Sequence, residues 1–329
     1  MAFFGIRFDF RNPPFASTTM HERYQAALDM TAWADRLGFV TVVLSEHHGS
    51  PDGYLPSPIT MAAAIAARTE RIRIQIAALV ASFHDPLRLA EDLAVVDLIS
   101  GGRLDVVIAN GYVGEEFAMF GVEPRARVTR TVETVETLKQ AWRGVPFEFR
   151  DRTVTVTPRP HQHGGPALTL GGSSEPAARR AARIGDGFMP STPELWEFYR
   201  DEMIQLGRAD PGPAMGGDTS MFHVTRDPDA AWEQIAPFAM HEVNAYGEWM
   251  ASAGVGSSGG YTPIDDAGAL RATGQYRTLT PDDLAREIEA KGPYGFTLFH
   301  PMMGGIPPAL AWESLHLFED EVLPKLASG

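Results

Sequence analysis

The chain has 329 residues, of which 44% are hydrophobic; its formal net charge is −14, and it contains no cysteine. The charge argues against nucleic-acid and anionic-membrane partners, which need clustered Lys and Arg, although a helix N-terminus can still hold an anionic cofactor. The absence of cysteine excludes disulfides, thiolate catalysis and cysteine-ligated metal centres. No apolar run reaches the roughly 18 residues of a membrane span, and residues 1–10 do not resemble a signal peptide, so a cytoplasmic protein is expected.

Short β-branched or aromatic runs alternate with amphipathic helical stretches, which predicts repeated βα units and a parallel sheet. In chain order, strands are expected at residues 3–10, 39–44, 72–80, 104–109, 167–170, 187–189, 220–225 and 295–300. Helices are expected between them at residues 21–37, 58–68, 86–99, 125–143, 175–184, 193–207, 228–253, 280–291 and 308–326. Eight strands are the number that a closed barrel needs, so we predict an α/β fold with one (β/α)8 TIM barrel over residues 1–329.

Two stretches interrupt this pattern. Residues 144–166 are an expected insertion, in which residues 147–156 alternate like a hairpin ahead of a Gly/Pro-rich loop. Residues 254–279 begin with a Gly/Ser-rich run and are long for a structureless connection, so they are either a functional lid or an unrecognised element. Residues 254–259 match G-x-G-x-x-G, but they follow a predicted helix instead of a strand, so no dinucleotide site is expected there.

Several histidines fall at or near the ends of predicted strands. They are His47 and His48 after the second strand, His84 after the third, His223 in the seventh and His300 at the end of the eighth. Strand ends meet at one mouth of a barrel, so these histidines are expected to share an active site, although each alone could be a surface histidine. With Glu46 beside it, His47 can move protons at neutral pH. No metal is expected, because neighbouring residues on a strand point to opposite faces.

A second candidate site is the run Gly171-Gly172-Ser173-Ser174, which lies between a predicted strand and a predicted helix. Two glycines let backbone N–H groups approach a ligand, the hydroxyls can donate, and the helix dipole favours an anion. The run therefore suits a phosphate cradle. The alternative is an ordinary turn in which a serine caps the helix.

Taken together, several segments resemble the luciferase-like monooxygenase superfamily, which includes F420-dependent oxidoreductases. The segments are residues 46–48, 84–92, 96–104, 109–112, 115–117, 120–121, 171–174 and 181–187. The resemblance is strongest over residues 1–190 and rests mainly on element order from 191 to 329. It implies a barrel that binds reduced FMN, or the deazaflavin F420, at its mouth. It also implies that residues 254–279 are a mobile active-site loop.

The resemblance assigns roles to residues of this chain. His47 corresponds to the family's proposed catalytic base, with Glu46 and His48 beside it. Ala77 and Ala78 match a non-prolyl cis peptide under the flavin ring. Further cofactor contacts are expected from Asn110, Gly111, Gly171, Gly172, Ser173 and Ser174, and the substrate pocket from His84, Tyr112, His223 and His300. Asn110 stands where luciferases place an arginine near the phosphate, which leaves the flavin type open.

The expected activity is a monooxygenase reaction on a small organic substrate, through a C4a-peroxyflavin formed from O2 and reduced FMN that a separate flavin reductase supplies. The alternatives are F420-dependent hydride transfer on the same barrel, a non-catalytic flavin-binding protein and a metal-dependent hydrolase. A homodimer is expected, because such barrels usually pair through their second and third helices and the small residues of 57–68 permit close packing.

Overall fold

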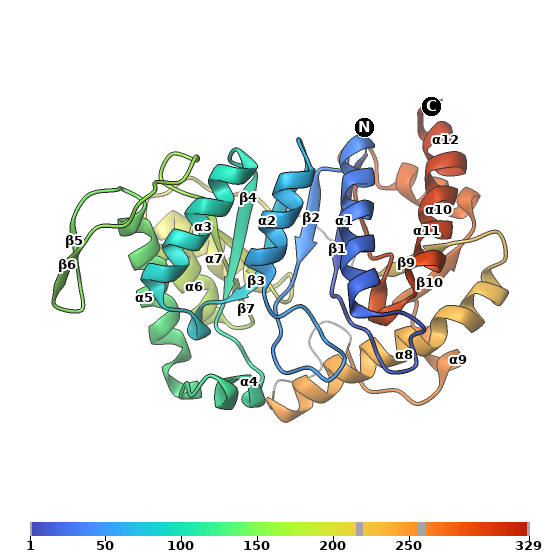
Figure 1. Ribbon diagram of the computed structural model, residues 1–329, viewed down its shortest axis with the longest axis horizontal. Helices are drawn as coiled ribbons and strands as arrows, with labels where there is room; N and C mark the ends of the chain where they lie inside the picture. Colours follow the sequence, from blue (N-terminus) through green and yellow to red (C-terminus); the bar gives the residue numbers. More distant parts are fainter. Residues whose placement is uncertain (1, 215–219, 255–260, 328–329) are drawn as a thin grey trace. The chain divides into compact units, whose positions relative to one another are not determined.

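The computed structural model describes residues 2–214, 220–254 and 261–327, and its contacts divide the chain into two compact units. Unit 1 comprises residues 1–43, 47–56 and 217–329, and unit 2 comprises residues 44–46 and 57–216. Both contain parallel strands and helices (Figure 1). In the part of the chain that is described, no helix is long and apolar enough to cross a membrane.

In unit 1, β1 lies between β11 and β2, and β9 pairs in parallel with β10. The strands are β1 (Phe3–Phe8), β2 (Thr41–Leu44, whose last residue groups with unit 2), β9 (Met221–Val224), β10 (Tyr276–Leu279) and β11 (Phe296–Phe299). The helices are α1 (Met20–Arg36), α8 (Pro228–Ser252), α9 (Ala267–Ala272), α10 (Pro281–Ala290), α11 (Pro308–Leu317) and α12 (Leu323–Ala327), with the short turns η4 (Met303–Gly305) and η5 (Phe318–Val322).

An aromatic cluster packs the strands of unit 1 against its helices. Phe4 of β1, Phe39, Phe299 of β11 and Phe318 of η5 are all buried, with ring centroids 4.6–6.2 Å apart. Burial of each phenyl side chain contributes roughly 2 kcal/mol. The cluster anchors β1 and β11, whose carboxyl ends carry the polar residues described below.

Unit 2 has the strand order β3-β4-β7-β8, all in parallel. These strands are β3 (Arg73–Val80), β4 (Leu104–Ala109), β7 (Leu168–Gly172) and β8 (Gly187–Pro190). The helices are α2 (Pro58–Arg68), α3 (Pro86–Ser100), α4 (Gly114–Met119), α5 (Arg127–Ala141), α6 (Glu175–Ile184) and α7 (Leu195–Gln205), with the short turns η1 (Ala81–Phe83) and η2 (Pro124–Ala126). Helices α2 and α3 lie side by side (Figure 1).

Arg103 holds the amino-terminal side of unit 2 together. Its guanidinium group donates to the backbone oxygens of Ala66, Thr69, Ile72 and Ser100, which come from α2, from the approach to β3 and from α3. Charge-assisted hydrogen bonds of this kind satisfy carbonyls that helix ends leave free. These bonds fix the positions of α2, α3 and the start of β3 relative to one another.

The structure agrees with most expected elements and adds three that the sequence did not predict, α4, α9 and β10. Residues 147–154 form the expected antiparallel hairpin of β5 (Phe147–Phe149) and β6 (Arg152–Val154). Of the two alternatives for residues 254–279, the second half agrees with unrecognised elements, because it forms α9 and β10. Residues 255–260 lie outside the described residues. β10 is a strand that the eight-strand prediction lacked, and α4 is a helix that it lacked.

Candidate functional site

The carboxyl ends of β3, β4 and β7 bring the predicted cofactor residues of unit 2 to one edge of its sheet. Val80 pairs with Ala109 and Ile108 with Leu170, so the strands end in register. Asn110 and Gly111 follow β4 directly, and Gly171 and Gly172 end β7. A parallel sheet presents its ligand-binding groups at this edge.

Ala77 and Ala78 lie within β3, close to this edge. The peptide bond between them is cis, as the resemblance implied, and the β3–β4 register shifts there. Both alanines are partly exposed, whereas Ile76 and Leu79 on either side are fully buried. Ser45 Oγ donates a 2.7 Å hydrogen bond to the Ala77 carbonyl oxygen and fixes the strand at this point.

Glu46 is buried in unit 2 and faces β3. Its Oε2 accepts a 2.7 Å hydrogen bond from the Val80 backbone N–H, and its Oε1 lies 3.2 Å from Nε2 of His84. The carboxylate therefore ties the end of β3 and orients the His84 imidazole. This geometry makes Glu46 a positioning residue for His84.

A network around Ser82 contains a cation that the sequence analysis missed. Ser82 Oγ donates a 2.9 Å hydrogen bond to the Asn110 carbonyl oxygen, and the Ser82 carbonyl accepts a 2.8 Å bond from Nε of Arg130. Arg130 is half-buried on α5, so a guanidinium group stands close to the position where Asn110 lacks one. Another arginine, Arg127, stands three residues before it on the same helix, and nothing in the sequence distinguishes the two.

The start of α6 keeps its polar groups accessible. Ser173 and Ser174 are exposed, and the Ser174 side chain does not cap the helix, so the ordinary capping interpretation does not hold. A Cβ on Gly172 would lie 2.6 Å from the Ala177 Cβ, so the glycine permits α6 to pack closely on β7. Glu175 at the helix start is paired with Arg179. Hydroxyls, a helix N-terminus and Arg130 are donors that suit a flavin phosphate.

In unit 1, His47 is buried among aromatic rings. Its imidazole stacks on Trp249 of α8, with centroids 4.2 Å apart and an angle of 25° between the planes. Tyr54 meets it edge-on at 4.9 Å, and Tyr246 lies 6.0 Å away. His48, the next residue, is half-exposed. The packing restricts the orientation of the His47 ring.

Behind these rings lies a buried cation that the sequence did not reveal. The Arg11 guanidinium sits 4.7–4.9 Å from the ring centroids of Tyr54, Tyr246 and Trp249 and forms an ion pair with Asp52. Nε2 of His241 lies 2.7 Å from the same carboxylate. Burial raises the pKa of Asp52, but the His241 hydrogen bond and the Arg11 charge outweigh it and hold that pKa well below its usual range.

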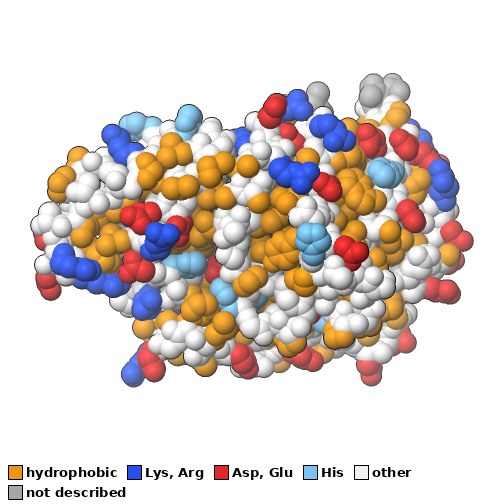
Figure 2. Space-filling view, viewed as in Figure 1, with side chains coloured by type: hydrophobic (Ala, Val, Ile, Leu, Met, Phe, Trp, Pro, Cys, Tyr) orange, Lys and Arg blue, Asp and Glu red, His pale blue; other side chains and the backbone are white. Residues whose placement is uncertain are grey.

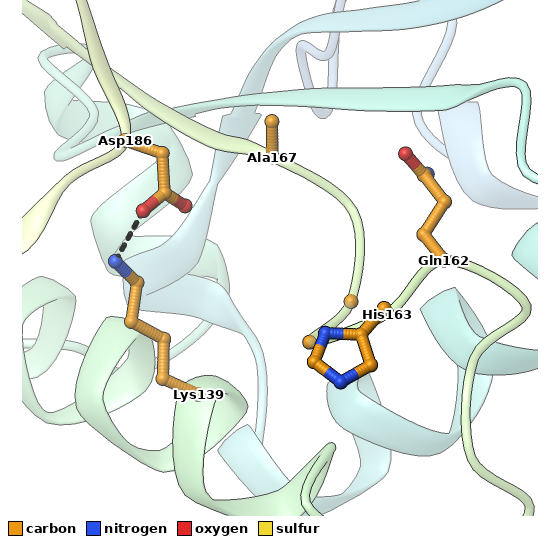
Figure 3. Close-up of a pocket in the computed structure, with 7 residues that line it drawn as sticks. Lys139, Gln162, His163, Ala167 and Asp186 are labelled. Atoms are coloured by element: carbon orange, nitrogen blue, oxygen red, sulfur yellow. Dashed lines mark hydrogen bonds and ion pairs between the residues drawn. The ribbon is translucent and has the colours of Figure 1, made fainter.

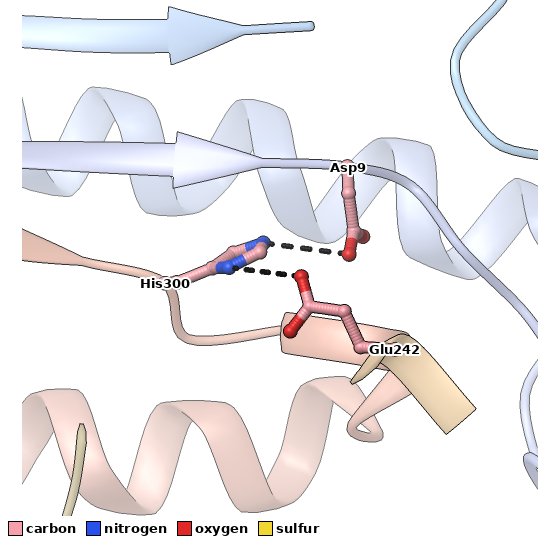
Figure 4. Close-up of side chains that lie close together, drawn as sticks. All are labelled: Asp9, Glu242 and His300. Atoms are coloured by element: carbon pink, nitrogen blue, oxygen red, sulfur yellow. Dashed lines mark ion pairs between the residues drawn. The ribbon is translucent and has the colours of Figure 1, made fainter. Parts of the chain in front are cut away.

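Two of the predicted pocket histidines are buried in unit 1. Burial lowers the pKa of His223 to about 4 and the pKa of His300 to about 3, so both are neutral at physiological pH. His300 follows β11 and lies between Asp9, which follows β1, and Glu242 of α8 (Figure 4). Neither acid was a sequence candidate.

A pocket of about 630 Å3 lies at the opposite edge of the unit 2 sheet (Figure 3). It is lined by Lys139, Gln162, His163, Ala167 and Asp186, among others, and Lys139 pairs with Asp186 at 2.6 Å. Ala167 precedes β7 and Asp186 precedes β8, so the pocket is at the amino ends of the strands. It is separate from the predicted cofactor residues of this unit.

Comparison with known proteins shows the family to which the chain belongs. The family model described as luciferase-like monooxygenase matches residues 3–289. The chain belongs to this family. The monooxygenase RslO1 from Streptomyces bottropensis has a similar structure, with a TM-score of 0.74 and 28% identity over 98% of this chain and 99% of that one. The predicted α/β class and luciferase-like fold are therefore confirmed.

Two curated relatives represent the two cofactor types of the family. An FMNH2-dependent dimethylsulfone monooxygenase from Pseudomonas putida is 29% identical over 217 residues, 61% of this chain and 59% of the relative. An F420-dependent glucose-6-phosphate dehydrogenase from Nocardia farcinica is 27% identical over 229 residues, 63% of this chain and 67% of the relative. The chain aligns with about half of the length of several curated relatives, between 43% and 59% for three of them.

The predicted luciferase-like site residues fall into both units. Unit 2 brings together Glu46 with His84, and places Ala77, Ala78, Asn110, Gly111 and residues 171–174 at one sheet edge; Tyr112 follows them, half-buried. Unit 1 holds His47, His48, His223 and His300. That all of them share one active site stays a prediction.

Proposed function

We propose that the chain is a flavin-dependent monooxygenase that uses reduced FMN and O2 on a small organic substrate. Membership of the luciferase-like family supports an oxidoreductase, and the Pseudomonas putida relative supports FMN in its reduced form. That relative also supports a separate reductase as the source of reduced flavin. The Nocardia farcinica relative keeps F420-dependent hydride transfer as the alternative.

The observation that carries the proposal is the donor set at the carboxyl edge of unit 2. Arg130, the hydroxyls of Ser173 and Ser174 and the start of α6 would hold the phosphate of FMN. Ala77 and Ala78 offer a small, partly exposed surface on which a flat ring can lie. When bound, reduced FMN supplies the electrons that activate O2.

The chain's own residues would manage protons and orientation. His47 is the candidate that holds or moves a proton at an imidazole nitrogen, and its aromatic neighbours exclude water from that ring. Glu46 fixes the direction of His84 through the bond at 3.2 Å. Exclusion of water protects reactive intermediates in such enzymes.

We further propose a homodimer that pairs through α3. Val95, Leu98 and Ile99 share one face of this helix and are 43%, 42% and 48% exposed. Hydrophobic side chains gather in the region of α2 and α3 (Figure 2). Exposed apolar patches of this kind mark interaction sites.

A cytoplasmic location also remains a prediction.

The test compares flavins and an arginine variant. The protein is titrated with FMN, riboflavin and F420, and O2 consumption with reduced FMN is followed across a panel of small organic substrates. Arg130→Gln is expected to weaken FMN binding roughly 10- to 100-fold, because a charge-assisted hydrogen bond is lost, and to leave riboflavin binding unchanged. Arg125→Gln is the control, because its side chain is 88% exposed and has only a weak ion pair with Glu123.

Each outcome separates the alternatives. Formation of product without O2 in the presence of F420 would favour the hydride-transfer enzyme over the monooxygenase. Tight flavin binding without any turnover, unaffected by His47→Ala, would favour a non-catalytic flavin-binding protein. Equal loss of FMN and riboflavin binding in Arg130→Gln would contradict the phosphate role.

A further inference from the structure

The acids Asp9 and Glu242 flank the imidazole of His300 in the buried part of unit 1. Asp9 Oδ2 lies 3.5 Å from Nε2, and Glu242 Oε1 lies 3.9 Å from Nδ1 (Figure 4). The three residues are 0–5% exposed. The imidazole therefore lies between two carboxyl groups that face different nitrogen atoms, and neither contact is short enough to form a hydrogen bond in this conformation. A single metal ion would bind only one nitrogen of a histidine.

The hydrogen bonds around this cluster determine where protons lie. Asp9 is held as an acceptor, because its Oδ1 accepts from the Arg11 backbone N–H and its Oδ2 from that of Gly304. A neutral imidazole has one N–H, and a carboxylate is a far better acceptor than the Met221 sulfur that lies 3.4 Å from Nδ1. The proton of His300 therefore belongs on Nε2, and Nδ1 is an acceptor.

Nδ1 can then accept a proton, and Glu242, whose Oε1 lies 3.9 Å away, is the carboxyl group that faces it. The Met221 thioether has no proton to give. Both Glu242 oxygens are buried without a hydrogen-bond partner among the described residues, and an ionised carboxylate in that position is strongly unfavourable. Burial, together with the charge of Asp9, raises the pKa of Glu242 to about 8.

The surrounding charges do not reverse this conclusion. The ionisable groups that face Glu242 are Arg7, Asp9 and Arg11 from β1 and its carboxyl end, Tyr276 from β10, Tyr261 and His300. Arg11 is already paired with Asp52, and Arg7 donates to the Tyr246 hydroxyl at 3.2 Å. The turn η4, which packs against α8, contributes no ionisable side chain.

We infer that the protein stores a proton on Glu242 at neutral pH and that His300 can pass it on to Asp9. In the transfer, the Glu242 O–H bond breaks and an Nδ1–H bond forms, while the Nε2–H bond breaks and an Asp9 O–H bond forms. One negative charge moves from Asp9 to Glu242, and nothing is oxidised or reduced. Glu242 acts through His300, so it is a positioning residue and not a catalytic one.

The inference does not depend on the proposed function, since it is tested on the flavin-free protein. Infrared spectra of the wild type and of two variants are compared at pH 6.5. The carbonyl stretch of the buried protonated carboxylic acid is expected in the wild type and in Glu248→Gln, but not in Glu242→Gln. Glu248 is the matched control, because it is exposed on the same helix. The band should disappear as pH rises, with a midpoint near 8. Identical spectra for wild type and Glu242→Gln would overturn the inference.

Two further measurements keep the test decisive if Glu242→Gln does not fold. Nitrogen-15 NMR of the wild type should show one imidazole, assigned to His300 by comparison with His300→Gln, that stays in the Nε2–H form from pH 8 to pH 5. Titration of the signal assigned to His300 in this range would contradict the relay. The EDTA-treated wild type and both variants are also titrated with Zn2+ and Mn2+. Tight binding of one ion that is lost in Glu242→Gln and kept in Glu248→Gln would overturn the inference and indicate a metal site.

Discussion

The His47 imidazole stacks on the Trp249 indole, with ring centroids 4.2 Å apart and planes 25° from parallel. One ring comes from the segment after β2 and the other from α8, so a helix far along the chain sets the orientation of the candidate proton-transfer residue. Four predictions test this and related contacts.

Trp249→Ala is expected to lower kcat/KM roughly 10- to 100-fold, because the imidazole proposed to transfer protons would lose its packing partner and sample unproductive orientations. Trp249→Phe keeps an aromatic face and should retain most of the activity. Both variants should unfold with free energies within about 2 kcal/mol of the wild type. Steady-state kinetics and urea denaturation measure the two effects, and equal activity of the alanine and phenylalanine variants would argue against the stacking role.

Asp52→Asn is expected to destabilise the fold by about 3–5 kcal/mol, because it leaves the buried Arg11 charge without its partner. The matched control is Asp105→Asn, which breaks the Arg73–Asp105 pair at 2.6 Å, where the arginine is 44% exposed. That pair lies near solvent, so the control should lose less than about 1 kcal/mol. Urea denaturation measures the free energy of unfolding of both variants. Similar decreases in that free energy would show that burial does not make the Arg11–Asp52 pair more important for stability than the exposed pair.

Three buried groups give a stability optimum near pH 6.5. The folded-state pKa values of His223, about 4, and His300, about 3, lie below the unfolded value of about 6.5. The unfolded chain then binds more protons up to that pH, and stability rises. The pKa of Glu242, about 8, lies above its unfolded value, so from pH 6.5 to 8 the folded protein binds more protons and stability falls.

The fall should amount to roughly 1 kcal/mol between pH 6.5 and 8, because the contribution of Glu242 is about 1.6 kcal/mol and the two histidines offset about half of it. Urea denaturation at a series of pH values measures it. Glu242→Gln removes the group that causes the fall, so its stability should no longer decrease over the same interval and should rise slightly as the two histidines lose their protons in the unfolded chain. A wild type whose stability is constant from pH 6.5 to 8 would contradict the raised pKa.

Gly172→Ala is expected to destabilise the protein by about 1–3 kcal/mol, because the new Cβ would meet the Ala177 Cβ at 2.6 Å and displace α6. FMN affinity should fall with it, since the start of α6 carries the proposed phosphate donors. At Gly171, the neighbouring position, the same Cβ would have only an ordinary contact at 3.6 Å. Gly171→Ala should therefore be tolerated, and the two variants together separate steric displacement from loss of a glycine.

The sequence predicts elements better than it predicts the site, for physical reasons. The alternation of strand and helix periods reveals the βα units, but the Gly/Ser-rich start of residues 254–279 conceals α9 and β10, which follow it. Histidines at strand ends form a local signal. Arg130 does not stand out, because nothing local distinguishes it from Arg127 on the same helix.

Burial is the property that sequence patterns miss most completely in unit 1. Arg11, Asp52 and Glu242 have no shared spacing, and charged residues are expected at the surface. Only the folded chain shows that these three charged residues are buried. A polar residue directly after a strand, such as Asp9 or Arg11, is the one signal that could have suggested them.

Helix α8 presents Glu242, Tyr246 and Trp249 at intervals of four and three residues, and so on one face. Each residue of an α-helix turns the chain by about 100°, so a single insertion or deletion earlier in α8 would swing all three side chains away at once. Such length changes should be strongly selected against in this helix. Recombination between relatives should accordingly exchange α8 whole, with crossovers placed in the loops at its ends.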